Sequence, residues 1–167
     1  MELVEQYDGD ASVQAVRDFF TKDDPQHPRN YWRIKRRYEA MYRLGSQWGD
    51  ITGVRGNGGN ATESKLIEGN AYSRAMKAIK EGLDCCLAVS REVIILRYIE
   101  QQKTWQIAER IGLTGNDRYQ RADRQACYEF ADVMDVIIPR YDVEELIPFF
   151  LQKGTKQEGN RNDLGTQ

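Results

Sequence analysis

Residues 89–131 read VSREVIILRYIEQQKTWQIAERIGLTGNDRYQRADRQACYEFA, and this stretch decides the fold. Its apolar residues recur at helical spacing in three segments, which predicts helices over 91–100 and 105–111 and a third helix after a short turn. Gly112 stands where the second helix must end, because glycine is the usual residue in a left-handed helix stop. The residues expected to cap the three helices are Ser90, Thr104, and Thr114 or Asn116.

The predicted third helix has an apolar and a polar face. Its apolar residues are spaced three, four and four apart, which predicts a buried stripe. The stripe consists of Tyr119, Ala122, Ala126 and Phe130. Because each residue turns a helix by about 100°, the polar residues between them lie on the outer face or on its flanks.

The last two helices and the turn between them have the layout of a helix-turn-helix, in which the last helix enters the major groove of DNA. Arginine pairs with guanine, and glutamine with adenine, through two hydrogen bonds each. We therefore predict that this helix reads bases, with Arg121 pointing most directly outward. The candidate DNA-contacting residues of this unit are Thr104, Asn116, Arg118, Gln120, Arg121, Arg124 and Gln125. The alternative interpretation is a solvated helix face, on which the acids Asp117, Asp123 and Glu129 offset the three arginines.

Upstream of this stretch, helical segments alternate with breaks. The spacing predicts helices over 11–21, 31–44 and 62–87, with Gly45 as the stop of the second helix. Glycines are frequent between residues 45 and 61, which indicates a linker. An apolar stripe in the 62–87 helix indicates core packing, and a dimer seam would have the same spacing. That stripe consists of Tyr72, Met76, Ile79 and Leu83. No segment alternates with period two, so we predict no substantial sheet.

The formal net charge of −2 hides strong segregation of charge along the chain. Residues 1–24 and 132–145 are acidic, whereas residues 29–43 carry six basic side chains and one acidic one. Arg33, Arg36 and Arg37 of this basic helix are candidate phosphate contacts. The aromatic residues expected to pack inward from it are Trp32, Tyr38 and Tyr42. The alternative is that the basic helix pairs with the acidic segments of its own chain, and the sequence leaves both interpretations open.

The composition argues against an enzyme, a metal site and a membrane protein. The chain has 167 residues and a single histidine, His27, which lies between two prolines in an expected loop, so a catalytic base is hard to find. Three cysteines, two of them adjacent, lack zinc-ligand spacing. We expect no catalytic residues, no cofactor and no metal. The longest apolar run is only four residues, and the acidic start lacks a secretory pattern, so we expect a cytoplasmic protein without a membrane partner.

Several short motifs resemble those of known transcription proteins. The run Val89-Ser90-Arg91-Glu92 before an Ile/Leu-rich helix resembles sigma factor region 4, which binds promoter DNA beside RNA polymerase. The chain is more similar still to the ArpU family of phage transcriptional regulators. The matching pieces are Trp105-Gln106-Ile107, Arg110-Ile111-Gly112, Arg118-Tyr119, Ala126, Phe130-Ala131 and the upstream Glu63-Ser64-Lys65-Leu66-Ile67.

The resemblance implies a mainly α fold, with a helical N-terminal part followed by a sigma region 4-like helix-turn-helix. The sequence pattern itself predicts three regions: 1–61 with the basic helix and linker, 62–135 with the DNA-binding unit, and 136–167 as a helical extension and flexible tail. The implied function is activation of phage or prophage late genes, which serve packaging, morphogenesis and lysis in a bacterial host. The implied partners are double-stranded promoter or operator DNA, host RNA polymerase and a second copy of the chain.

A small terminase subunit, which hands DNA to a packaging motor, is the alternative function. Such a protein would form a ring and would need a strong oligomerisation segment after its DNA-binding unit. Residues 133–151 are apolar enough to be considered, but Pro139 and Pro148 interrupt them.

Overall fold

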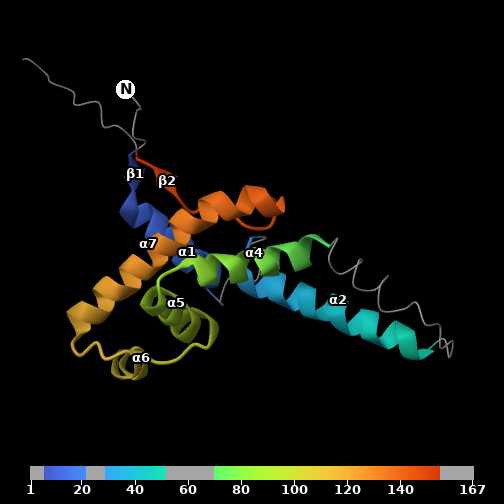
Figure 1. Cartoon of the computed structure of the whole chain (residues 1–167), viewed down its shortest axis with the longest axis horizontal. Helices are drawn as coiled ribbons and strands as arrows, with labels where there is room; N and C mark the ends of the chain where they lie inside the picture. Colours follow the sequence, from blue (N-terminus) through green and yellow to red (C-terminus); the bar gives the residue numbers. More distant parts are fainter. Residues whose placement is uncertain (1–5, 22–28, 52–69, 155–167) are drawn as a thin grey trace, which may run out of the picture.

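Helix α7 (Asn116–Tyr141) is central to the fold, and three of the helices that precede it in the sequence pack against it (Figure 1). The computed structural model describes residues 6–21, 29–51 and 70–154. The remaining elements are β1 (Tyr7–Asp8), α1 (Gly9–Phe20), α2 (Tyr31–Ile51), α4 (Ala71–Cys85), α5 (Ala88–Ile94), the π-helix η1 (Ile95–Ile99), α6 (Thr104–Arg110) and β2 (Gln152–Lys153). The prediction of a mainly α fold is confirmed.

The main core forms where α1, α4 and α5 meet α7. Phe20 from α1 and Phe130 from α7 are fully buried, with ring centroids 5.6 Å apart. Phe150 follows α7 in the chain and returns to the same core, 5.7 Å from the Phe130 ring. Aromatic rings at this spacing bury a large apolar surface and pack favourably at an angle to one another. The segment that follows α7 therefore contributes Phe150 to the core.

Helices α4 and α7 approach each other closely at Gly82. A Cβ atom at this position would overlap Met134 Sδ and lie 3.2 Å from the Phe130 ring. On the same helix Ile79 and Leu83 are buried, and Tyr72 and Met76 are partly buried. The apolar stripe predicted here therefore contributes to the core of its own chain.

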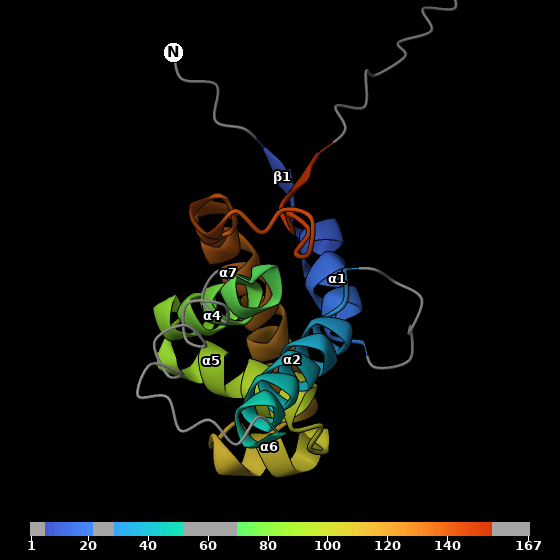
Figure 2. The same cartoon turned by 90° about the vertical axis from the view of Figure 1, so that its right-hand side faces the viewer.

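A second, smaller apolar cluster attaches α6 to its neighbours. Leu96 of η1, Ile107 of α6 and Tyr119 of α7 are buried together, and Ala108 and Ile111 pack against them. Figures 1 and 2 show α6 at one end of the bundle, beside α5 and the start of α7. A core of this size stabilises little by itself, so α6 depends on η1 and α7 for its position.

A two-residue antiparallel pairing joins the two ends of the described chain. Tyr7 pairs with Lys153 and Asp8 with Gln152. The prediction of a flexible tail is therefore wrong for Gln152 and Lys153. Backbone pairing and the bond from Gln152 N to Ser12 Oγ, 2.9 Å long, hold this strand. Between α7 and β2, residues 142–151 form turns and extended chain.

Several predicted helix boundaries differ from the structure. Helix α2 continues through Gly45 to Ile51, since one helical glycine costs only about 1 kcal/mol and does not by itself end a helix. Helix α5 begins at Ala88, with Leu87 rather than Ser90 at the N-cap, and Ser90 is buried. Thr104 is the first residue of α6 and not its cap.

Two further boundaries concern α7. Gly115, with a positive φ of 106°, precedes α7, so neither Thr114 nor Asn116 caps it; only glycine adopts such a conformation easily. The helix then runs unbroken through residue 135, where the sequence suggested a division, and it includes Pro139.

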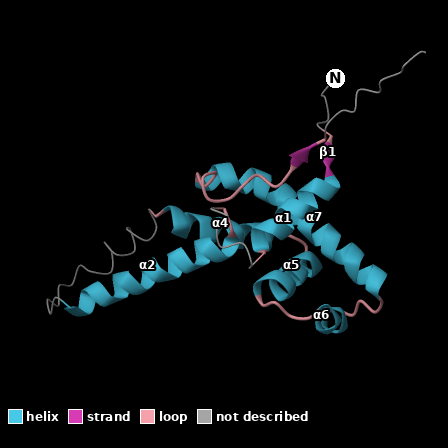
Figure 3. Ribbon diagram, turned by 180° about the vertical axis from the view of Figure 1, so that it is seen from behind, coloured by secondary structure: helices cyan, strands magenta, loops and turns pink. Residues whose placement is uncertain are grey.

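Some sequence features lie outside the described residues, namely His27, the glycine-rich segment 56–61 and the motif Glu63–Ile67. Among the described helices, none has both the length and the hydropathy needed to cross a membrane. Figures 1 and 3 show the end of α2 and the start of α7 on opposite sides of the molecule. The basic helix and the predicted base-reading helix therefore extend in different directions.

Candidate nucleic-acid interface

Two glycines shape the turn between α6 and α7. Gly112 has a φ of 71°, so the predicted left-handed stop of α6 is confirmed. Leu113 N donates to Ala108 O at 2.8 Å, which closes the end of α6. Gly115, with a φ of 106°, then redirects the chain into α7. A side chain at either position would strain the backbone, so the turn requires both glycines.

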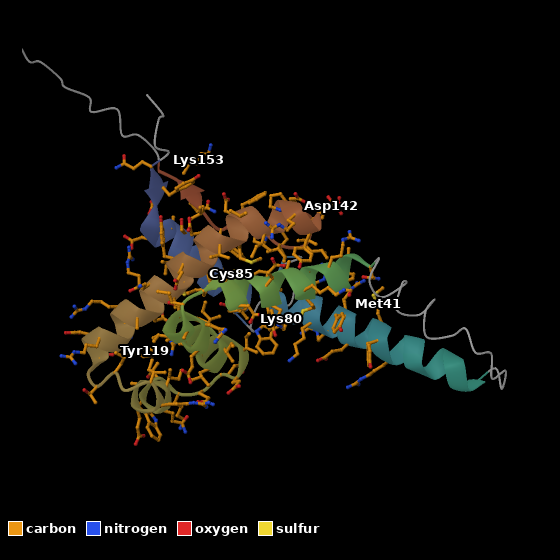
Figure 4. All side chains as sticks on the ribbon, in the orientation of Figure 1. Met41, Lys80, Cys85, Tyr119, Asp142 and Lys153 are labelled. Carbon is orange, nitrogen blue, oxygen red and sulfur yellow. The ribbon has the colours of Figure 1, made fainter. Side chains whose placement is uncertain are left out.

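The first half of α7 presents the faces that the sequence predicts. Tyr119, Ala126 and Phe130 are buried, and Ala122 is partly buried. The candidate base-reading residues are all exposed, namely Asn116, Arg118, Gln120, Arg121, Arg124 and Gln125. Figure 4 shows Tyr119 where α7 begins beside α6. The outer face of α7 is therefore rich in groups that donate hydrogen bonds and open to a ligand.

Arg124 is exposed but paired, in contrast to the simple outward orientation expected from the sequence. Its Nη1 donates to Oδ1 of Asp10 in the first turn of α1. Next to this pair lies an open groove of about 690 Å³, whose lining includes Gly9, Arg121 and Tyr128. The outer face of α7 is therefore bounded on one side by the start of α1.

Asp123 is buried, so the interpretation of this acid as part of a solvated face is wrong. Arg17 Nη2 of α1 lies 2.7 Å from its Oδ2, and the Tyr98 hydroxyl of η1 donates to its Oδ1 at 2.8 Å. Arg97 Nε lies 3.9 Å from the same Oδ1. A buried carboxylate requires such partners, because an unpaired charge inside a protein is very costly. Asp123 therefore ties α7 to α1 and η1.

The π-helix η1 places two neighbouring side chains against α7. Burial, supported by Cys127 and Asp123 nearby, raises the pKa of the Tyr98 hydroxyl, which stays protonated and can donate to Asp123. The Arg97 guanidinium lies 5.8 Å from the ring centre of Tyr119. Within the described part of the chain, the buried Tyr119 hydroxyl has no hydrogen-bond partner. The inner side of α7 is thus held by a polar cluster as well as by apolar packing.

A second groove, of about 450 Å³, runs between α6 and the start of α7. Thr104 and Trp105 of α6 line one side, and Asn116 lines the other. The Trp105 side chain is 61% exposed, the largest such apolar group near this groove. The structure therefore brings Thr104 and Asn116, two candidate contacts, to the same groove.

The basic helix α2 lies apart from the outer face of α7. Arg36 and Arg37 are exposed, Arg33 is partly buried, and Arg37 lies 5.7 Å from the ring centre of Tyr72 in α4. Figure 1 shows α2 extending from the bundle on the side opposite to the start of α7. The structure therefore does not bring Arg33, Arg36 and Arg37 together with the candidate residues of α7.

The aromatic residues of α2 pack inward only in part. Trp32 is half-buried, and its Nε1 donates to Phe20 O at 2.9 Å. Tyr38 is partly buried. Tyr42 is 58% exposed, so the expectation that it packs inward is wrong, because α4 covers only the first part of α2.

Two residues of this region, Asp10 and Asp123, were not recognised as functional candidates. Asp123 follows Tyr119 by four residues, and at about 100° per residue it lies only about 40° from it on the helix. The helical spacing therefore places Asp123 on the buried face, although its charge suggests an exposed position. Asp10 is 114 residues from Arg124 in the sequence, so no local pattern indicates their contact.

Within the residues that the structure describes, no group of three or more His, Cys, Asp or Glu side chains could hold a metal ion. Comparisons with profiles of known protein families, with curated protein sequences and with solved structures found no match.

Proposed function

We propose that this protein binds double-stranded DNA in a sequence-specific manner, with α6, the turn and α7 acting as a helix-turn-helix. The first half of α7 lies in the major groove and reads bases. The resemblance to ArpU family regulators extends the proposal to activation of phage late genes, with host RNA polymerase and a second copy of the chain as further partners.

One observation carries the proposal. The outer face of α7 exposes three arginines and two glutamines within eight residues, whereas the inner face of the same helix is fixed by buried contacts. Arginine and glutamine are the side chains that pair bidentately with guanine and adenine in the major groove. Base reading requires donors of this kind on an element that cannot rotate, and Tyr119 and Asp123 restrain α7 in that way.

The position of Arg121 makes it the first candidate for a guanine contact. It lies in the second turn of α7, on the face opposite to the buried stripe, and it is exposed. Residues near the start of a recognition helix make most base contacts. Within the described residues, no ion pair joins Arg121 to Asp117, so its guanidinium is free to meet a base.

The test is a binding titration of Arg121→Ala against a site selected from a random duplex library and against a scrambled duplex. The variant should lose about 1–3 kcal/mol of binding free energy on the selected site and much less on the scrambled duplex. Arg140→Ala is the matched control. Arg140 is an exposed arginine at the other end of α7, paired with Glu81 at 3.2 Å.

If Arg121→Ala, Arg118→Ala and Arg124→Ala all keep the discrimination of the parent protein, α7 does not read sequence and the proposal fails. If the control loses as much discrimination as Arg121→Ala, the effect belongs to overall charge and not to base reading.

A further inference from the structure

The start of α1 lies directly against the candidate reading face of α7. The Asp10 carboxylate accepts a hydrogen bond from Nη1 of Arg124. A Cβ atom on Gly9 would lie 3.5 Å from Arg124 Nη2 and 3.8 Å from the Tyr128 ring. The guanidinium therefore rests on the first turn of α1, with its charge opposed by Asp10.

The fold holds Asp10 in this position. Asp8 precedes α1 and accepts from Ala11 N at 3.0 Å, which caps the helix. The pairing of β1 with β2 and the bond from Gln152 N to Ser12 Oγ fix the chain on either side of the cap. A carboxylate in the first turn of a helix is also favoured by the helix dipole. Asp10 is thus a fixed negative charge beside α7.

A DNA phosphate that approaches Arg124 meets this charge. Both side chains are exposed, 51% for Arg124 and 83% for Asp10, so a phosphate can reach the pair and compete with the carboxylate. If the phosphate takes the place of Asp10, one ionic contact replaces another and the released carboxylate repels the duplex. Arg124 then adds little to the electrostatic attraction between the protein and the DNA phosphates, which is the same for all sequences.

We propose that Asp10 holds Arg124 by an ion pair and thereby lowers the affinity of the protein for DNA of any sequence. Discrimination then depends on the residues nearer the start of α7, among them Arg121. This inference rests on the proposed function, because it concerns the same DNA-facing surface.

The test compares Asp10→Asn with the parent protein on the scrambled duplex and on the selected site over a series of salt concentrations. Asp10→Asn should bind the scrambled duplex about threefold more tightly, and the slope of log K against log salt should steepen by about one counterion. Binding to the selected site should tighten by a similar factor, so the affinity ratio between selected site and scrambled duplex should stay close to that of the parent. Thermal melting should match that of the parent, since both partners of this pair are exposed.

Two further variants show whether the effect passes through Arg124. Asp18→Asn removes the same charge from an exposed acid on α1 that bonds to Gln14, at 2.8 Å, instead of α7, and it should bind DNA as the parent does. In the double variant Asp10→Asn, Arg124→Ala, the gain on the scrambled duplex should disappear. A gain of equal size in Asp18→Asn overturns the proposal in favour of overall charge.

The remaining outcomes are distinct. The proposal is overturned if Asp10→Asn leaves binding to the scrambled duplex unchanged. It is also overturned if Asp10→Asn weakens binding to the selected site alone, a result that would mean that Asp10 orients Arg124 toward a base. If Arg121→Ala still loses discrimination in that experiment, the proposed function survives. If the parent binds neither duplex, both proposals fail together.

Discussion

At the scale of the single residue, the buried ion pair of Asp123 has a large expected effect on stability. Asp123→Ala should lower the free energy of unfolding by about 3 kcal/mol, the lower end of the range for a broken buried ion pair. The lower end applies because the Arg17 and Arg97 side chains are each 36% exposed and keep part of their hydration. Chemical denaturation followed by circular dichroism measures this loss.

Asp117→Ala is the control for this change. Asp117 is an exposed acid in the first turn of the same helix, so its removal should cost no more than about 1 kcal/mol. Equal losses in the two variants would mean that Asp123 contributes only as an exposed charge.

The sequence predicts which way the candidate residues of α7 face, but not which residues of other helices they contact. The outward position of Arg121 follows from the spacing of the buried stripe, because helical geometry is local. The pairing of Arg124 with Asp10 and of Asp123 with Arg17 joins residues more than 100 positions apart. Such contacts depend on how α1 crosses α7, which the spacing within either helix does not specify.

At the scale of the element, the crossing of α4 and α7 depends on the absence of a side chain at Gly82. Gly82→Ala should lower the free energy of unfolding by about 1–2 kcal/mol. Its better helix propensity gains about 1 kcal/mol, but the added methyl group overlaps buried Met134. Thermal and chemical denaturation measure the balance.

Gly9→Ala is the matched helical control, since a Cβ there meets nothing closer than 3.5 Å. Its stability should equal or exceed that of the parent. A Gly82→Ala protein that is also more stable would show that Met134 moves aside without cost and that the crossing is not close.

The helices themselves were largely predictable, whereas their ends were not. The spacing of Val13, Val16, Phe19 and Phe20 identifies α1, and all four residues are buried. Gly112 was identified because a left-handed stop requires glycine. The stop predicted at Gly45 and the cap predicted at Ser90 are wrong because a glycine also fits inside a helix, and a serine also fits, buried, in the first turn of one.

At the scale of the whole molecule, most apolar residues of 133–151 pack within the chain, and Val136 and Phe149 are exposed. Met134, Ile138, Val143, Ile147 and Phe150 are buried in the main core. A ring-forming terminase subunit would need an oligomerisation segment after its DNA-binding unit. The five buried residues cannot form such a segment, because they already pack inside their own chain. The proposed regulator has no such requirement.

We therefore expect light scattering to give a mass close to 19.4 kDa, or to twice that value for a dimer. Measurement at several concentrations separates these two states. A mass many times larger, independent of concentration, would contradict the proposed regulator and favour the packaging protein.

The bond between Ser12 and Gln152 also bears on the order of events during synthesis on the ribosome. These residues are 140 positions apart, so α1 completes its contacts only when β2 has been translated. Until α7 and Phe150 emerge from the ribosome, Phe19 and Phe20 contact Tyr31 but lack Phe130 and Phe150, which complete their cover. The nascent chain therefore presents a partly covered apolar helix until α7 has been translated, and it is a natural client for a chaperone at the ribosome exit.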